Sequence, residues 1–177
     1  MTAETWLLGF LLAQGALGAF DTLYNHEHVE RLRHRPQARP ELVLHAVRES
    51  IYAALFLGLA WFAWQGAAAL AIGALVAAEV AITALDEAVE NRTRVLPQNE
   101  RVLHVFLTLN LGLLVAALVP VLGDWAARPT GIVFESHGLP SIALTALGLA
   151  SASWSALDAL ASRRLSSPCQ PASPPQY

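Results

Sequence analysis

Two short stretches of the chain carry a carboxylate and an imidazole at the same spacing. One is Glu41-Leu-Val-Leu-His45 and the other is Glu100-Arg-Val-Leu-His104. Residues four apart lie on the same side of a helix, one turn from each other, so each pair can face one ion. Both side-chain types are common ligands of divalent metals. The spacing therefore predicts metal binding, and the repetition suggests two ions.

Further acids and histidines lie near these pairs at helical spacings. Glu49 continues the step of four after His45. Glu79, Asp86 and Glu90 follow one another at steps of seven and four, which predicts one stripe along a helix. We interpret these positions as one set of candidate metal ligands, consisting of Asp21, His26, His28, Glu41, His45, Glu49, Glu79, Asp86, Glu90, Glu100 and His104.

The acids also have a purely structural interpretation, in which Glu41, Glu90, Glu100 and the loop acids are interfacial residues paired with the abundant arginines. Glu41 and Glu100 each follow a residue that is favoured at the start of a helix, where an acid also offsets the helix dipole. Arg48 could neutralise a neighbouring acid in place of a metal ion. This interpretation accounts for the glutamates but leaves His45 and His104 without an explanation. We assign no role to other polar residues off the stripes or in loops, such as Glu27, Glu30, His34, Glu87, Glu135 and His137.

The composition is that of an integral membrane protein. Of 177 residues, 55% are hydrophobic and only 14% are charged, and the mean hydropathy is +0.44. A net charge of −3 gives no reason to expect a nucleic acid partner. The single cysteine, Cys169, rules out a disulfide framework and a thiolate cluster, so nitrogen and oxygen atoms must hold any metal.

Five segments are long and apolar enough to cross the bilayer, which requires about 20 residues. We therefore predict an all-α integral membrane bundle, in which a four-helix unit with a polar core is joined by a fifth transmembrane helix. The expected domain covers residues 1–165 and is followed by a disordered tail, rich in proline and serine, at 166–177. The spans are expected at 4–24, 42–64, 66–85, 102–122 and 139–161.

The arginines predict an orientation, because short loops rich in arginine stay in the cytoplasm. They concentrate in the loops after the first and third spans and at the start of the tail. The N-terminus is then outside, and the acids and histidines of four spans meet at the cytoplasmic leaflet. Glu79 lies about two turns deeper, where an unpaired charge is costly.

The two halves of the chain share an order of polar residues. Asp21 precedes the Glu41 motif, and Asp86 precedes the Glu100 motif. This order predicts two helical hairpins related by an axis along the membrane normal.

Three functions are compatible with these residues. The first is a membrane oxidoreductase that uses a di-metal centre, with iron ahead of manganese or zinc, on a lipid-soluble substrate. Soluble di-iron proteins build such centres in four-helix bundles, although with a Glu-x-x-His spacing. Oxygen activation would be its leading chemistry, and hydrolysis by a metal-bound water the second. The alternatives are a cation or proton carrier or channel, and a non-catalytic membrane assembly subunit.

The chain also resembles a family of small, uncharacterised bacterial multi-pass membrane proteins. The resemblance extends almost to the tail and is carried by runs such as Asp21-Thr-Leu-Tyr, Arg39-Pro-Glu-Leu-Val-Leu-His-Ala, Asn91-Arg-Thr-Arg, Glu100-Arg-Val-Leu-His and Arg128-Pro-Thr-Gly. It implies a location in the bacterial inner membrane. It carries over no catalytic residue.

Overall fold

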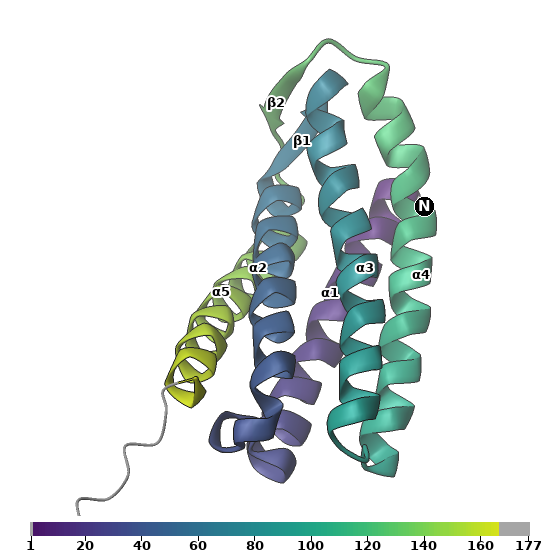
Figure 1. Cartoon of the computed structure of the whole chain (residues 1–177). Coiled ribbons are helices and arrows are strands. Elements are labelled where there is room, and N and C mark those ends of the chain that lie inside the picture. Colours follow the sequence, from purple (N-terminus) through teal and green to yellow (C-terminus); the bar gives the residue numbers. More distant parts are fainter. Residues whose placement is uncertain (1, 167–177) are drawn as a thin grey trace, which may run out of the picture.

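The computed structural model describes residues 2–166 and contains five long helices (Figure 1). Each helix is long and apolar enough to cross a membrane, which confirms the predicted all-α bundle. The tail predicted from residue 166 onward lies, apart from Ser166, outside the described residues. The helices are α1 (Ala3–Phe20), α2 (Arg39–Trp61), α3 (Ala69–Thr93), α4 (Gln98–Ala126) and α5 (Leu139–Leu165).

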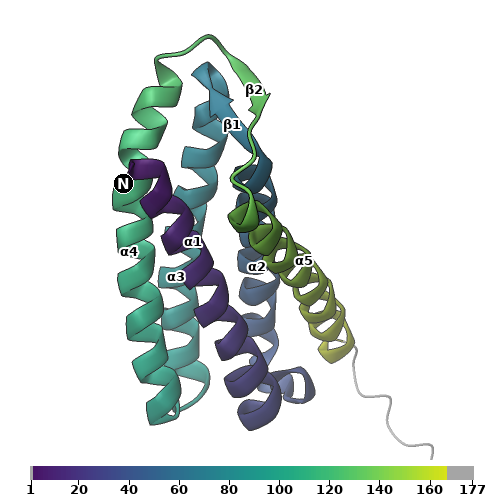
Figure 2. The ribbon, with the colours of Figure 1, turned by 180° about the vertical axis from the view of Figure 1, so that it is seen from behind.

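The helices pack in a definite pattern. α1 lies against α4, α2 lies against α3, and α5 packs along α2 while diverging from the other helices toward residue 165 (Figures 1 and 2). Every helix contributes to the apolar core, through Leu11, Phe56, Ile72, Leu114 and Leu144, all at most 2% exposed. The fifth helix is therefore part of the bundle and helps to form its interior.

A wider helical segment extends α1 beyond the predicted end of the first span. This π-helical segment, η1 (Asp21–Glu30), ends at Arg31, whose φ of 52° is left-handed. In a π-helix each hydrogen bond spans five residues, so Asp21 and His26 face the same side. Two short 3₁₀ turns, η2 (Leu32–His34) and η3 (Pro36–Ala38), then lead into α2.

The repeated Glu-His motifs begin the helices that carry them. Glu41 lies in the first turn of α2 beside a proline, and Glu100 lies in the first turn of α4. Proline suits this position because its fixed φ and missing N–H match the start of a helix. Both helix starts lie at the end of the bundle where η1 and the C-terminal end of α3 also lie (Figure 1).

A small two-stranded sheet caps the opposite end of the bundle. β1 (Phe62–Gln65) pairs with β2 (Gly131–Phe134) antiparallel, with Phe62 opposite Phe134. The 3₁₀ turn η4 (Gly66–Ala68) follows β1, and a Cβ added at Gly66 would lie 2.5 Å from Thr130. The predicted second span, 42–64, wrongly continued the helix into β1, and the predicted spans left β2 in a loop, because neither strand is long enough to show an alternating pattern.

Candidate metal centre

Acids and histidines from α2, α3, α4 and η1 form one buried cluster at the end of the bundle where α2 and α4 begin. Most of its members are almost completely buried: Asp21 (2% exposed), His26 (5%), Glu41 (0%), His45 (1%), Asp86 (2%), Glu90 (1%) and Glu100 (0%). His104 completes the cluster and is partly exposed. The structure thus brings together most of the predicted candidate ligands.

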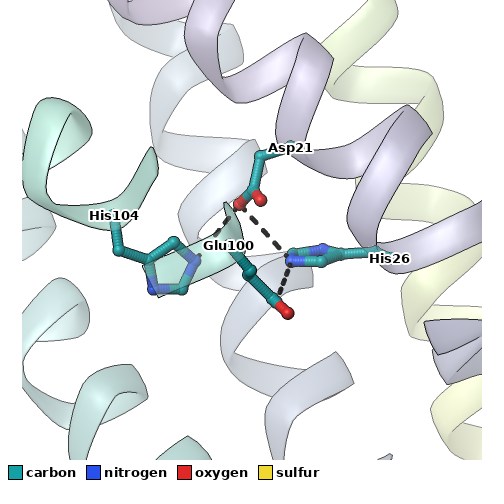
Figure 3. Close-up of side chains that lie close together, drawn as sticks. All are labelled: Asp21, His26, Glu100 and His104. Atoms are coloured by element: carbon teal, nitrogen blue, oxygen red, sulfur yellow. Dashed lines mark ion pairs between the residues drawn. The ribbon is translucent and has the colours of Figure 1, made fainter. Parts of the chain in front are cut away.

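The first group within this cluster contains Asp21, His26, Glu100 and His104 (Figure 3). Nε2 of His26 lies 3.4 Å from Oδ2 of Asp21 and 3.6 Å from Oε1 of Glu100, and Nε2 of His104 lies 3.4 Å from the same Asp21 oxygen. These distances exceed the usual hydrogen-bond range of about 2.7–3.2 Å. Ligands bound at about 2.1 Å to a tetrahedral metal lie roughly 3.4 Å from each other. The first group therefore has the spacing of a metal site.

The second group contains His26, Glu41, His45 and Glu90, with one possible ligand atom from each residue lying within 4.8 Å of all the others. The rings of His26 and His45 are stacked, with centroids 4.5 Å apart. Glu90 directs Oε1 toward Nε2 of His45 at 3.8 Å and Oε2 toward Nδ1 of His104 at 3.4 Å. His26 belongs to both groups, although one of its nitrogens can bind only one ion, and Glu90 lies between two histidines, in a position where a carboxylate could bridge two ions.

Two histidine nitrogens in the cluster form no hydrogen bond of normal geometry, although Nε2 of His26 lies 3.4 Å from Asp21 and Nε2 of His45 lies 3.2 Å from Asp86. Among residues 2–166, Nε2 of His26 and Nε2 of His45 are buried and form no hydrogen bond. Such atoms are uncommon in folded proteins, because each loses its hydrogen bonds to water without forming one in the protein. Both atoms face carboxylate oxygens, so a cation between them would satisfy nitrogen and oxygen together.

Two arginines neutralise part of the acidic charge. Arg94 donates hydrogen bonds from Nη2 to Oε1 of Glu41 at 2.8 Å and to Oε1 of Glu100 at 2.6 Å. Burial alone would lower the pKa of Arg94, but these two acids outweigh it and raise the pKa above its usual range. Arg48, which the sequence analysis considered as a rival to a metal ion, binds Asp86 at 2.6 Å.

Arg94 is the main participant that the sequence analysis did not single out. It follows α3 in the loop to α4, and its ion pairs with Glu41, Glu90 and Glu100 are those that the structural interpretation of these acids expects. The sequence signal that could have identified Arg94 is its position four residues after Glu90. In the structure the two side chains form an i, i+4 ion pair at 3.4 Å.

The contacts between the two halves of the chain are crossed. Asp21 of the first half faces His104 of the second at 3.4 Å, and Asp86 of the second half faces His45 of the first at 3.2 Å. The glutamates of both repeated motifs meet on Arg94. An approximate two-fold axis that relates the two hairpins would produce these crossed contacts.

Four of the candidate ligands lie outside the groups with metal-ligand spacing. Glu49 and Glu79 face a cavity beside the cluster, and Asp86 lines the same cavity while contacting His45. His28 is exposed and lies against Tyr24, with ring centroids 6.2 Å apart. Among the described residues, none of these four belongs to a group with metal-ligand spacing.

Three residues to which we assigned no role do belong to such groups. Glu87 joins Glu90 and His104 in a third group that overlaps the second. Glu135 and His137 form a separate group with Glu4, and all three side chains are partly exposed. The sequence separation between residue 4 and residues 135–137 concealed this proximity.

The cavity has a volume of about 170 Å³ and adjoins the buried cluster of acids and histidines. Its polar end includes Asp21, Glu90 and His104, and its apolar walls include Phe56 and Leu147. All five helices contribute to its lining. A molecule in the cavity would therefore contact both the cluster and the apolar interior of the bundle.

Comparisons with protein-family models, curated proteins and solved structures find no match to this chain.

Proposed function

We propose that this chain is a membrane-embedded di-metal oxidoreductase that acts on a lipid-soluble substrate at the cytoplasmic leaflet of a bacterial inner membrane. The observation that supports this function is the pair of adjacent buried groups of acids and histidines, with Glu90 between His45 and His104. Ligands limited to nitrogen and oxygen favour iron, manganese or zinc over copper(I). Iron is the first candidate, because di-iron centres are built from acids and histidines facing inward from four helices.

The charges in the cluster also support a metal. Asp21, Glu41, Asp86, Glu90 and Glu100 supply five carboxylates, whereas Arg48 and Arg94 supply two positive charges, which leaves three negative charges. A buried charge without a partner is costly at membrane depth. Divalent ions would compensate these acids, and protonation of the three histidines would do so as well. Metal content therefore distinguishes the two explanations.

The cavity gives a substrate access to the cluster, since Asp21, Glu90 and His104 belong to both. Two metal ions in such a position would allow oxidation of the substrate with O₂ as the electron acceptor. Hydrolysis by a metal-bound water is the second possible reaction. The chain's own side chains would hold the ions and separate them from bulk water. Hydrogen bonds from neighbouring groups would orient the ligating side chains.

The test is elemental analysis of the purified chain. We expect stoichiometric iron, manganese or zinc in the wild type, and loss of most of it in the His45→Ala, His104→Ala double variant. A single variant, His26→Ala, should also lose metal, whereas the matched control His28→Ala should retain it because His28 is exposed. Circular dichroism would verify that each variant remains helical. Equal metal in the wild type and in the His26 variant would refute the site.

A cation or proton carrier is the second candidate function. Polar groups in the middle of the bundle favour it. Glu79 is 1% exposed, and farther along the bundle the side chain of Asn110 donates to that of Gln14 at 2.7 Å. Beyond them, Leu11 and Leu114 are buried in the apolar core, which opposes a continuous path. Purified chain that contains no metal but moves protons or cations across vesicles would favour the carrier.

A further inference from the structure

The cavity beside the metal cluster is lined by buried polar atoms without partners. Within the described residues these are Oε2 of Glu49, the hydroxyl of Tyr52, Oε2 of Glu79, Oδ1 of Asp86 and Nε1 of Trp154. The tyrosine and tryptophan groups can donate hydrogen bonds, and the carboxylate oxygens can accept them. Because such atoms are usually satisfied, their convergence indicates a ligand that carries both donors and acceptors.

The size and walls of the cavity limit that ligand. A volume of about 170 Å³ is close to that of an engineered apolar protein cavity of about 150 Å³ that binds benzene. Phe56, Leu111 and Leu147 provide apolar surface, and Gly18 of α1 leaves space beside it. One six-membered ring with small substituents fits this combination better than a flexible polar molecule does.

The cavity also reaches the outer surface of the bundle. Its lining includes Ala19, Leu23 and Thr108, all of which are exposed, and Leu23 is 55% exposed. In a membrane this surface faces lipid, so a ligand can keep an apolar chain in the bilayer while its ring enters the protein.

We propose that the cavity binds a six-membered ring that bears hydroxyl or carbonyl oxygens and is carried on a lipid chain, as in a lipid-soluble quinol. This inference rests on the proposed function, because it names the substrate class of that centre. A ring hydroxyl would donate to Glu79 or Glu49 and accept from Tyr52, while the ring faces would contact Phe56 and Leu147. The rival occupant is water, which would satisfy the same polar atoms.

The experiment uses the full chain in lipid nanodiscs, with empty nanodiscs as the reference. The probe is a benzoquinol with a decyl chain, and decylbenzene is the matched probe without oxygens. Calorimetric titration should show saturable binding of about one quinol per chain and much weaker binding of decylbenzene, because only the quinol satisfies the polar atoms. Metal content is measured on the same samples.

Two variants and one control variant test whether the quinol binds in the cavity. Gly18→Leu should weaken quinol binding by about tenfold or more, because a Cβ at Gly18 meets no atom within 4 Å and a larger side chain can occupy the cavity. Gly9→Leu makes the same change on the same helix, also in open space but outside the cavity lining, and should leave binding unchanged. Tyr52→Phe removes only a hydroxyl and should weaken binding about fivefold.

The outcomes separate the two proposals. Absence of saturable quinol binding, equal binding of decylbenzene, or equal effects of the Gly18 and Gly9 variants would overturn the ring-binding inference, even if the chain contains stoichiometric metal. A chain without metal would instead refute the proposed function, whether or not the quinol binds. Saturable quinol binding that Gly18→Leu abolishes, in a chain that keeps its metal, supports both.

Discussion

Arg94 connects the two repeated motifs at the level of single residues. Its guanidinium binds Glu41 of one motif and Glu100 of the other, and its side chain is only 9% exposed. A carboxylate oxygen that accepts from arginine keeps a lone pair for a metal, and ligating carboxylates are commonly held in this way. We infer that Arg94 positions the two acids and does not replace the ions.

Loss of Arg94 should destabilise the folded bundle. In the Arg94→Ala variant the buried acids Glu41 and Glu100 lose their cation, and breaking a buried ion pair in this way costs about 3–5 kcal/mol. The control is Arg92→Ala at the exposed end of α3, which should change the free energy of unfolding by less than about 0.5 kcal/mol. Circular dichroism during unfolding in mixed detergent micelles measures both. Equal stability of the two variants would show that Arg94 is dispensable.

Glu90 should determine how many ions bind, because its two oxygens face different histidines. Glu90→Gln keeps the shape of the side chain but removes its charge, and we expect the metal content to fall from two ions per chain to one or fewer. Glu87→Gln should retain two, since the Glu87 side chain is 57% exposed and belongs only to the third group. Elemental analysis that finds the same ratio in both variants would contradict a bridging position for Glu90.

At the level of elements, helical spacing predicted which residues share a side but not which residues meet. The step of four correctly indicated that Glu41 and His45 are buried on one side of α2. It did not indicate that η1 is a π-helix, in which His26 lies on the same side as Asp21. A step of five is out of phase in an α-helix, so His26 carried no periodic signal to connect it with Asp21.

Long-range pairing accounts for the other elements that the sequence did not reveal. β1 and β2 are four-residue strands separated by two helices, and each becomes a strand only by pairing with the other. The depth of Glu79, in contrast, was predictable from the apolar residues around it, and the structure places it at 1% exposure. The sequence could not show that Glu49 and Glu79 face the cavity, because that depends on how α5 packs along α2.

The packing of α5 on α2 should depend on one glycine. A Cβ added at Gly148 would lie 2.8 Å from Cγ of Leu57, so a larger residue must push the helices apart. Gly148→Leu should reduce the free energy of unfolding by about 1–3 kcal/mol. Gly112→Leu on α4, where an added Cβ meets nothing within 4 Å, is the control and should be neutral or slightly stabilising. A Gly148 variant as stable as its control would indicate that α5 does not pack closely there.

At the scale of the whole molecule, the starts of α2 and α4, which carry residues of the buried cluster, and the small sheet lie at opposite ends of the bundle (Figure 1). If all five candidate helices cross a membrane, the start of α1 and the end of α5 lie on opposite sides of it. The arginine distribution assigns the cluster end to the cytoplasm. This assignment stays a prediction, because the structure contains no membrane.

Cysteine labelling in intact cells tests the orientation. In a Cys169→Ser background, which removes the only native cysteine, Gln98→Cys lies at the cluster end and Arg128→Cys near the sheet, both at exposed positions. A thiol reagent that cannot cross membranes should label position 128 at once and position 98 only after the cells are opened. Labelling of position 98 in intact cells would reverse the orientation.

X-ray absorption at the metal edge of the purified protein tests the central claim most directly. The account predicts a first shell of nitrogen and oxygen at about 2.0–2.2 Å, imidazole scattering that decreases in His26→Ala but not in His28→Ala, and a second metal at about 3.5–4 Å. A wild-type chain without stoichiometric metal, or a shell that the His26 variant leaves unchanged, would show that the cluster is held together by its arginines and protonated histidines alone.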